Sequence, residues 1–155
     1  MSVNRRLLAV LALVAALAAL VVSTPAGATD ETTKCTAGAV LKGENENPPS
    51  GSKAVGAILV HVNDTKLSFA LAIANPARET FTRGHIHVGA ADVNGPVLVT
   101  LFEGSTDRKL ILQAARLDIT SDIAARICAD PGGFYVNYHT TDFPGGAIRG
   151  QLVSG

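Results

Sequence analysis

The chain has 155 residues and balances 13 basic with 13 acidic side chains. A leader of 28 residues would leave 127, the size of a single domain with a substantial core. Because two basic residues, Arg5 and Arg6, lie in that leader, the remaining 11 face 13 acidic residues, a net charge near −2. This charge excludes the basic footprint of a nucleic-acid-binding protein and a strong attraction to anionic membranes.

The N-terminus has the pattern of a secretory signal peptide. Two arginines precede an unbroken apolar run, 7–22, which is followed by the small-residue triplet 26–28. We expect cleavage after Ala28, a secreted, extracellular protein and no membrane attachment after cleavage. A transmembrane anchor is disfavoured, because the 16-residue run is shorter than the roughly 20 residues of a spanning helix. Residues 29–35 then form an N-terminal segment ahead of the folded domain.

Both cysteines, Cys35 and Cys128, remain after this cleavage. In an exported protein two cysteines most simply form one disulfide. The bridge would close a loop of about 90 residues, which the chain-entropy model values at ~4 kcal/mol of stability. The alternative is that both thiols ligate a metal ion. Their wide separation and the absence of a neighbouring histidine disfavour it.

Alternation of apolar with small or polar residues predicts β-strands along the rest of the chain. The clearest case is 66–73, in which Leu67, Phe69 and Leu71 fall on one face. Turns rich in Pro, Gly and Asn separate the runs. The predicted strands span residues 36–41, 54–62, 66–73, 80–88, 96–102, 110–117, 134–140 and 147–153.

One helix is predicted, at Ser121–Ala129. Thr120 or Ser121 can cap its N-terminus, and Ile123 and Ile127 are spaced by four residues. About eight short strands with one short helix predict an all-β fold. We expect an antiparallel Greek-key sandwich or flattened barrel.

Three of the four histidines lie in segments predicted to be strands. His85 and His87 alternate with Ile86 and so share one face of their strand. His139 lies in the later run 134–140. If the two strands are neighbours, the three imidazoles converge. They would then form either a hydrogen-bonded structural network or a ligand set for copper or zinc.

Other polar residues have two interpretations each. Asn137 is a candidate to orient a ligating histidine, and its alternative is a bond to a loop backbone. Arg149 is a candidate to face an anion, and its alternative is a structural ion pair with Glu44 or Glu46. His61 is interpreted as a solvated strand residue rather than a fourth ligand.

Five ordered segments resemble a known family. They are 41–49, with Gly-Glu-Asn-Glu-Asn-Pro-Pro, 84–89, with Gly-His-Ile-His-Val-Gly, and then 94–97, 134–140 and 144–152. Together they look like a CHRD (chordin-type) domain over about residues 36–153, and we assign 36–155 to it. The resemblance implies a β fold and an extracellular location, as in animal developmental regulators and exported microbial proteins. It implies no particular activity.

A fainter resemblance concerns the histidines. Copper–zinc superoxide dismutases are Greek-key β-barrels with a His-x-His copper-ligand pair, a later copper histidine and an arginine that guides an anionic substrate. His85 and His87, then His139 and Arg149, occur here in that order. No histidine lies between residues 88 and 138, so the bridging ligand and the zinc loop of those enzymes are missing. The resemblance therefore implies at most a copper site of three imidazoles.

Motifs of common enzymes do not occur in the sequence: nucleophile elbows, Gly-rich phosphate loops, Cys-x-x-Cys pairs and His-Glu-x-x-His zinc helices are all missing. Two hypotheses follow. The first is a secreted, non-catalytic CHRD β-sandwich module that binds an extracellular protein or matrix component. The alternative is a copper- or zinc-binding protein, with a possible redox role, that uses His85, His87 and His139.

Overall fold

The structure, a computed structural model, describes residues 32–155 of the chain. The predicted signal peptide and its cleavage after Ala28 lie outside these residues. Within the described part, no helix has the length and apolar character needed to cross a membrane. The predicted all-β fold with one short α-helix is confirmed.

Every predicted strand has an observed counterpart, and 134–140 is reproduced at both ends. The segment 147–153 is not one strand: it breaks at Leu152, whose backbone N–H donates to the Phe134 carbonyl at 3.0 Å. The first strand begins at Lys34, inside the segment expected to precede the domain. The strands are β1 (Lys34–Lys42), β2 (Val55–Asn63), β3 (Lys66–Ala74), β4 (Phe81–Val88), β5 (Val97–Thr106), β6 (Leu110–Asp118), β7 (Phe134–Thr140), β8 (Ile148–Gln151) and β9 (Val153–Ser154). The helices are α2 (Ser121–Ala129) and the short 3-10 turns η2 (Gly43–Asn45) and η3 (Pro131–Gly133).

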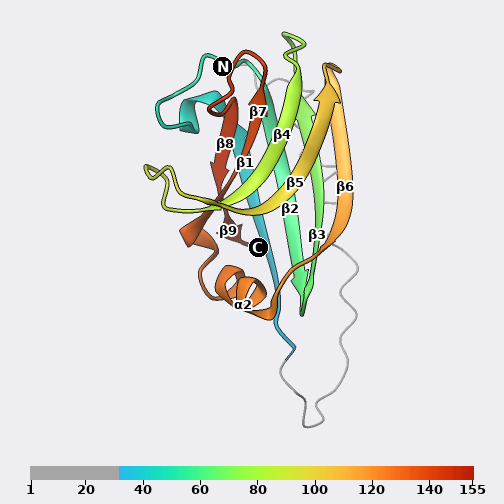
Figure 1. The fold of residues 1–155 in the computed structure, drawn as a ribbon, viewed down its shortest axis with the longest axis vertical. Helices are drawn as coiled ribbons and strands as arrows, with labels where there is room; N and C mark the ends of the chain where they lie inside the picture. The colour runs from blue at the N-terminus through green and yellow to red at the C-terminus, as the bar shows by residue number, and fades with distance from the viewer. Residues whose placement is uncertain (1–31) are drawn as a thin grey trace. The chain divides into compact units, whose positions relative to one another are not determined.

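The strands form one antiparallel sheet in the order β5-β4-β7-β8-β1-β2-β3-β6, and β9 pairs with β1. The sheet curls into a nearly closed barrel, so that β4 and β5 lie in front of β2 and β3 in Figure 1. β3 pairs with β6 and not with β4, which is a Greek-key connection. The edge strands β5 and β6 do not pair within the described chain, so the barrel keeps one open seam.

The barrel encloses an apolar core, because alternate residues of each strand point inward. In β3 the inward set begins with Leu67, Phe69 and Leu71, as its period of two predicts. Tyr138 of β7 is also fully buried, and its hydroxyl donates to Gln113 at 3.1 Å. Any side chain at Gly84 would collide with the Tyr138 ring, which explains the glycine in the middle of β4.

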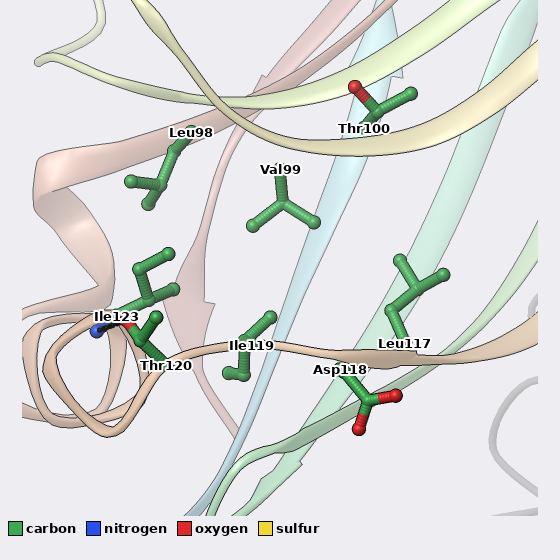
Figure 2. Close-up of a pocket in the computed structure, with 8 residues that line it drawn as sticks. All are labelled: Leu98, Val99, Thr100, Leu117, Asp118, Ile119, Thr120 and Ile123. Carbon is green, nitrogen blue, oxygen red and sulfur yellow. Dashed lines mark hydrogen bonds between the residues drawn. The ribbon is translucent and has the colours of Figure 1, made fainter.

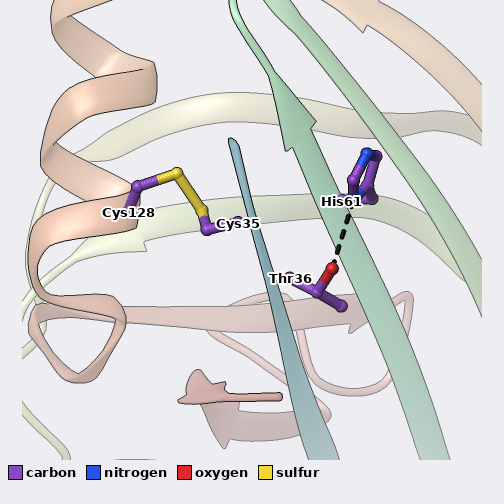
Figure 3. The surroundings of a disulfide bond; sticks show 4 residues. All are labelled: Cys35, Thr36, His61 and Cys128. Carbon is purple, nitrogen blue, oxygen red and sulfur yellow. Dashed lines mark hydrogen bonds between the residues drawn. A yellow bond between two sulfur atoms is a disulfide. The ribbon is translucent and has the colours of Figure 1, made fainter. Parts of the chain in front are cut away.

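The predicted disulfide between Cys35 and Cys128 is confirmed. It joins the start of β1 to the end of α2 (Figure 3). Thr120 caps this helix by accepting from the Ile123 N–H at 3.2 Å, as predicted. Figure 3 also shows His61, which is exposed and whose ring Nδ1 lies 3.1 Å from the Thr36 hydroxyl.

An apolar cleft of about 500 Å³ lies at the seam between β5 and the end of β6. In Figure 2 the side chains of Val99, Leu117 and Ile119 point into it. It exists because the two edge strands separate there without pairing. None of the histidines lines this cleft, so the polar chemistry of the molecule is elsewhere.

Candidate functional site

The outward residues of β4, β7 and β8 form a layer that we call the polar outer face. In register, His85 lies opposite Asn137, and Asn137 lies opposite Arg149, so three strands contribute to one row. Such a surface would normally be solvated, yet all but one of its members are buried. The face consists of His85, His87, Tyr135, Asn137, His139, Arg149 and the half-buried Gln151.

Two loops cover this face. One is 43–54, between β1 and β2, and the other is 89–96, between β4 and β5. They are tied together, because the Asn47 side chain donates to the Asp92 carbonyl and the Asn94 side chain donates to the Asn47 carbonyl, both at 2.6 Å. The cover excludes water from groups that would otherwise be hydrated.

The three predicted histidines lie together on this face. Each offers a ring nitrogen, and these atoms all lie within 4.8 Å of one another. His85 Nδ1 and His139 Nε2 are 3.2 Å apart. His87 packs edge-on against His85, with ring centroids 5.4 Å apart. The pairing of β4 with β7 brings them together, because it sets Arg83 of β4 opposite His139 and His85 opposite Asn137.

Backbone carbonyls fix the tautomers of two of these rings. His87 Nδ1 lies 2.9 Å from the Gly95 carbonyl, and His139 Nδ1 lies 3.0 Å from the Pro144 carbonyl. A carbonyl oxygen only accepts, so both Nδ1 atoms carry the proton. In the neutral rings both Nε2 atoms therefore present lone pairs. His139 Nε2 accepts from His85 Nδ1, whereas His87 Nε2 is buried without a partner among the described residues.

The electrostatics of the site keep the imidazoles neutral. Burial, followed by the neighbouring His139, His87 and Arg83, lowers the pKa of His85 from 6.5 to about 4. Burial also lowers the pKa of His87 and of His139, partly opposed by their bonds to backbone carbonyls and, for His87, by the neighbouring Asn137 side chain. Neutral imidazole is the form that binds a metal ion, so proton competition is weak at neutral pH.

A buried carboxyl group lies beside the histidines. Burial raises the pKa of Glu46 to about 7, although Arg149 and a hydrogen bond from Asn137 act in the opposite direction. Its carboxylate lies over Gly146, where a side chain would occupy the same space. Glu46 Oε1 and Asn137 Oδ1 are buried without partners in the described chain. Glu46 does not join the histidine cluster as a ligand.

Arg149 does not make the expected ion pair with Glu44 or Glu46. Its guanidinium instead donates to the Ala90 and Val93 carbonyls, both at 2.8 Å, and to the Asn94 side chain at 3.0 Å. Glu44 pairs with Lys42 at 3.0 Å. The ion pair fails because Arg149 points into the cover, where loop carbonyls satisfy its planar donors.

Arg149 also stacks on an aromatic ring. Its guanidinium carbon is 3.3 Å from the centre of the Tyr135 ring. The Tyr135 ring also stacks on the ring of His87, with centroids 4.8 Å apart and an interplanar angle of 6°. At 1 % exposure Arg149 has no access to a dissolved anion. Its role is to hold loop 89–96, whose Gly95 carbonyl sets the His87 tautomer.

The three imidazoles fit a transition-metal ion. Ligand nitrogens 2.0–2.1 Å from a tetrahedral metal stand about 3.3 Å apart, close to the observed separation between His85 Nδ1 and His139 Nε2. To ligate through Nδ1, His85 would give up the proton that it now donates to His139, by moving it to its own Nε2. His87 would have to move toward the other two rings, since the ligand atoms now lie within 4.8 Å of one another, and its unpartnered Nε2 is the group that gains most from this. The cysteines contribute nothing, since both are in the disulfide.

Sequence reasoning missed two residues of the site. Arg83 is exposed and lies two residues before His85, on the same face of β4. The alternation that selected His85 and His87 would have included it. The burial of Glu46 had no signal in the sequence, because it depends on how loop 43–54 folds over the sheet.

A comparison with protein-family models matches residues 37–152 to the model described as the CHRD domain. No curated protein and no solved structure matches the chain. The match covers the barrel except for the start of β1 and β9, and it includes both covering loops and every residue of the polar outer face.

Proposed function

The chain belongs to the CHRD-domain family, and on that premise we propose that it is an exported domain that binds one copper or zinc ion through His85, His87 and His139. The observation that carries this proposal is the buried, unpartnered Nε2 of His87 next to two further imidazoles. A purely structural network would satisfy that atom, because an unmet buried acceptor costs about 1–3 kcal/mol.

The ligand chemistry supports copper or zinc over harder ions. Imidazole nitrogens suit these two metals, whereas calcium and magnesium require oxygen ligands. Gly95 and Pro144 carbonyls orient two of the rings in the way that protein metal sites orient their histidines. Three protein ligands leave a further coordination position open.

Metal analysis of protein prepared without an affinity tag tests the proposal. We expect one copper or zinc ion per chain, and no uptake by the His87→Ala variant, with its β circular-dichroism spectrum retained. His61→Ala is the matched control, since His61 is an exposed strand histidine on another part of the barrel, and it should bind like the wild type. A wild type that takes up no metal, or a His87→Ala variant that binds as tightly, would contradict the proposal.

A second candidate function, binding of another protein, is favoured by a different surface. The outward residues of β1, β2, β3 and β6 form what we call the apolar outer face. Leu112 is 59 % exposed, and Val40, on the same cross-strand row, is 48 % exposed. The face consists of Gly38, Val40, Val55, Ala57, Leu59, Ala70, Ala72, Ala74, Leu110, Leu112 and Ala114.

This face extends over four neighbouring strands. Four strands spaced about 4.8 Å apart, with outward residues about 6.8 Å apart along each strand, give roughly 400 Å² for three rows. Contiguous apolar patches above a few hundred Å² on soluble domains mark interaction sites. We propose that it binds an apolar protein surface, with a second copy of the domain as the simplest partner.

Sedimentation velocity over a wide concentration range tests this second candidate. We expect reversible association that Leu112→Lys abolishes, because the lysine would be desolvated in the middle of the contact. Arg116→Gln, two outward positions along β6 from Leu112, is the control and should associate like the wild type. A domain that stays monomeric throughout would contradict self-association through this face.

A further inference from the structure

We infer that the histidine site, once it holds a divalent metal, takes a small inorganic anion as an additional ligand, and that Arg83 supplies the second contact to that anion. This inference rests on the proposed metal function and names the ligand class for the same site. It is carried by the charges at the histidines and by the difference between Arg149, on the polar outer face, and Arg83, beside it on β4.

The first step is the charge of the ligand set. All three ligands are neutral imidazoles, and no carboxylate of the described chain belongs to the cluster. The buried Glu46 lies over Gly146 and contacts Asn137. A divalent ion bound here would therefore keep its full charge in a poorly hydrated place. An exogenous anion in the open coordination position would offset that charge.

The second step separates Arg149, which belongs to the polar outer face, from Arg83, which lies beside it on β4. Arg149 is buried, stacks on Tyr135 and donates to three acceptors of loop 89–96. It is a structural clamp and cannot turn toward an anion. The expectation that Arg149 faces the anion is therefore not supported by its contacts.

Arg83 has the opposite properties. It is exposed, follows the outward side of β4 with His85 and lies directly opposite His139 on β7. Such cross-strand and same-face neighbours are within reach of a long side chain. Glu103 of β5 is its other cross-strand neighbour, yet among residues 32–155 the two form no ion pair within 4.0 Å. The guanidinium is therefore free to contact an anion held at the histidines.

Azide binding to the copper(II)-loaded protein tests this inference. The azide-to-copper charge-transfer absorption gives a dissociation constant at fixed ionic strength. We expect Arg83→Gln to bind copper one-to-one as the wild type does, but to bind azide about fivefold more weakly, the upper end of the range for an exposed charge pair. Raising the salt concentration should weaken azide binding more in the wild type than in this variant.

Two controls make the result specific to charge. Arg116→Gln removes an exposed arginine on β6, a strand that does not pair with β4, and should leave azide affinity unchanged. Free imidazole, a neutral ligand, should bind the copper of Arg83→Gln and of the wild type equally. Equal azide affinity of wild type and Arg83→Gln, with copper bound in both, would overturn the role of Arg83 and leave the metal proposal intact. Failure of the wild type to bind copper would overturn both.

Discussion

The two outer faces of this barrel have opposite characters. On the polar outer face the side chains are polar and buried, and Arg149 is 1 % exposed. On the apolar outer face the side chains are apolar, and all but Ala72 are partly or largely exposed, with Leu112 at 59 %. Each arrangement costs free energy that a purely structural sheet would avoid. The comparison teaches that function is to be sought on the outside of the barrel, at these two faces, rather than at the apolar cleft of the seam.

The lengths of the connections explain the difference. Loops 43–54 and 89–96 are long enough to fold back over β4, β7 and β8, and their asparagines tie them together. The connection between β2 and β3 is a turn of two residues, Asp64 and Thr65, which cannot cover a face. Both faces start from the same alternation of strand residues, and the loops decide which one is buried.

The largest expected effect on stability comes from removing the disulfide, which lies on neither face. Replacing both Cys35 and Cys128 by alanine removes a bridge between residues 93 positions apart, and should lower the free energy of unfolding by about 4 kcal/mol. Urea denaturation measures this loss. Metal uptake at low temperature should remain one-to-one, because the bridge joins β1 to α2 and contacts neither face. Loss of uptake in a folded double variant would show that the polar face depends on the bridge.

A smaller effect tests the buried clamp of the polar face. Arg149→Met keeps much of the packing on Tyr135 but leaves the Ala90 and Val93 carbonyls without their donor. We expect a loss of about 3 kcal/mol in the free energy of unfolding, since bonds from a charged donor contribute more than neutral ones. Arg116→Met, on the exposed side of β6, should change stability by less than about 0.5 kcal/mol. Similar values for the two variants would remove the contrast between the faces.

The sequence predicts the sheet well because its physical signal is local. Alternation in 66–73 and 134–140 reflects one apolar core, and it also places His85 and His87 on one side of β4. The break at Leu152 has no such signal, since the residue continues an apolar pattern while its N–H bonds to Phe134. Strand alternation therefore predicts which side of a strand each residue faces better than it predicts where the strand ends.

The burial of the polar face could not be predicted from sequence. It arises from the tertiary fold of two loops, and loops have no periodicity that reveals what they cover. For this reason the sequence left two interpretations of Arg149, facing an anion or pairing with Glu44 or Glu46, whereas in the structure its guanidinium binds the carbonyls of loop 89–96. The presence of acidic residues in a sequence does not show whether an arginine will bind them or will donate to backbone carbonyls instead.

The pH dependence of stability sharpens the polar side of the comparison. The pKa of Glu46 is about 7 in the folded protein and 4.5 as its ordinary value, so the folded state holds an extra proton between these values. Its contribution to stability is present below pH 4.5 and is lost as the pH rises through 7. Glu46→Gln, which stays neutral, should therefore gain up to about 2 kcal/mol relative to the wild type over this window. The histidines are common to both metal-free proteins, so urea denaturation at several pH values isolates Glu46. A difference that does not change with pH would show that Glu46 is ionised and solvated.

The smallest expected effect is on the apolar face, and it decides whether that face is free. Leu112 and Ile111 are neighbours on β6, but Leu112 points outward and Ile111 lies in the core at 4 % exposure. Ile111→Ala should cost about 2–5 kcal/mol, because it removes buried methylene groups and leaves a cavity. Leu112→Ala removes groups that are already in water, so its cost at low protein concentration should stay below about 0.5 kcal/mol. Denaturation at high concentration should then show a larger cost for Leu112→Ala, because association stabilises only the folded wild type. If the two substitutions cost the same at every concentration, Leu112 is packed within the domain, and the contrast between a covered polar face and an open apolar face is wrong.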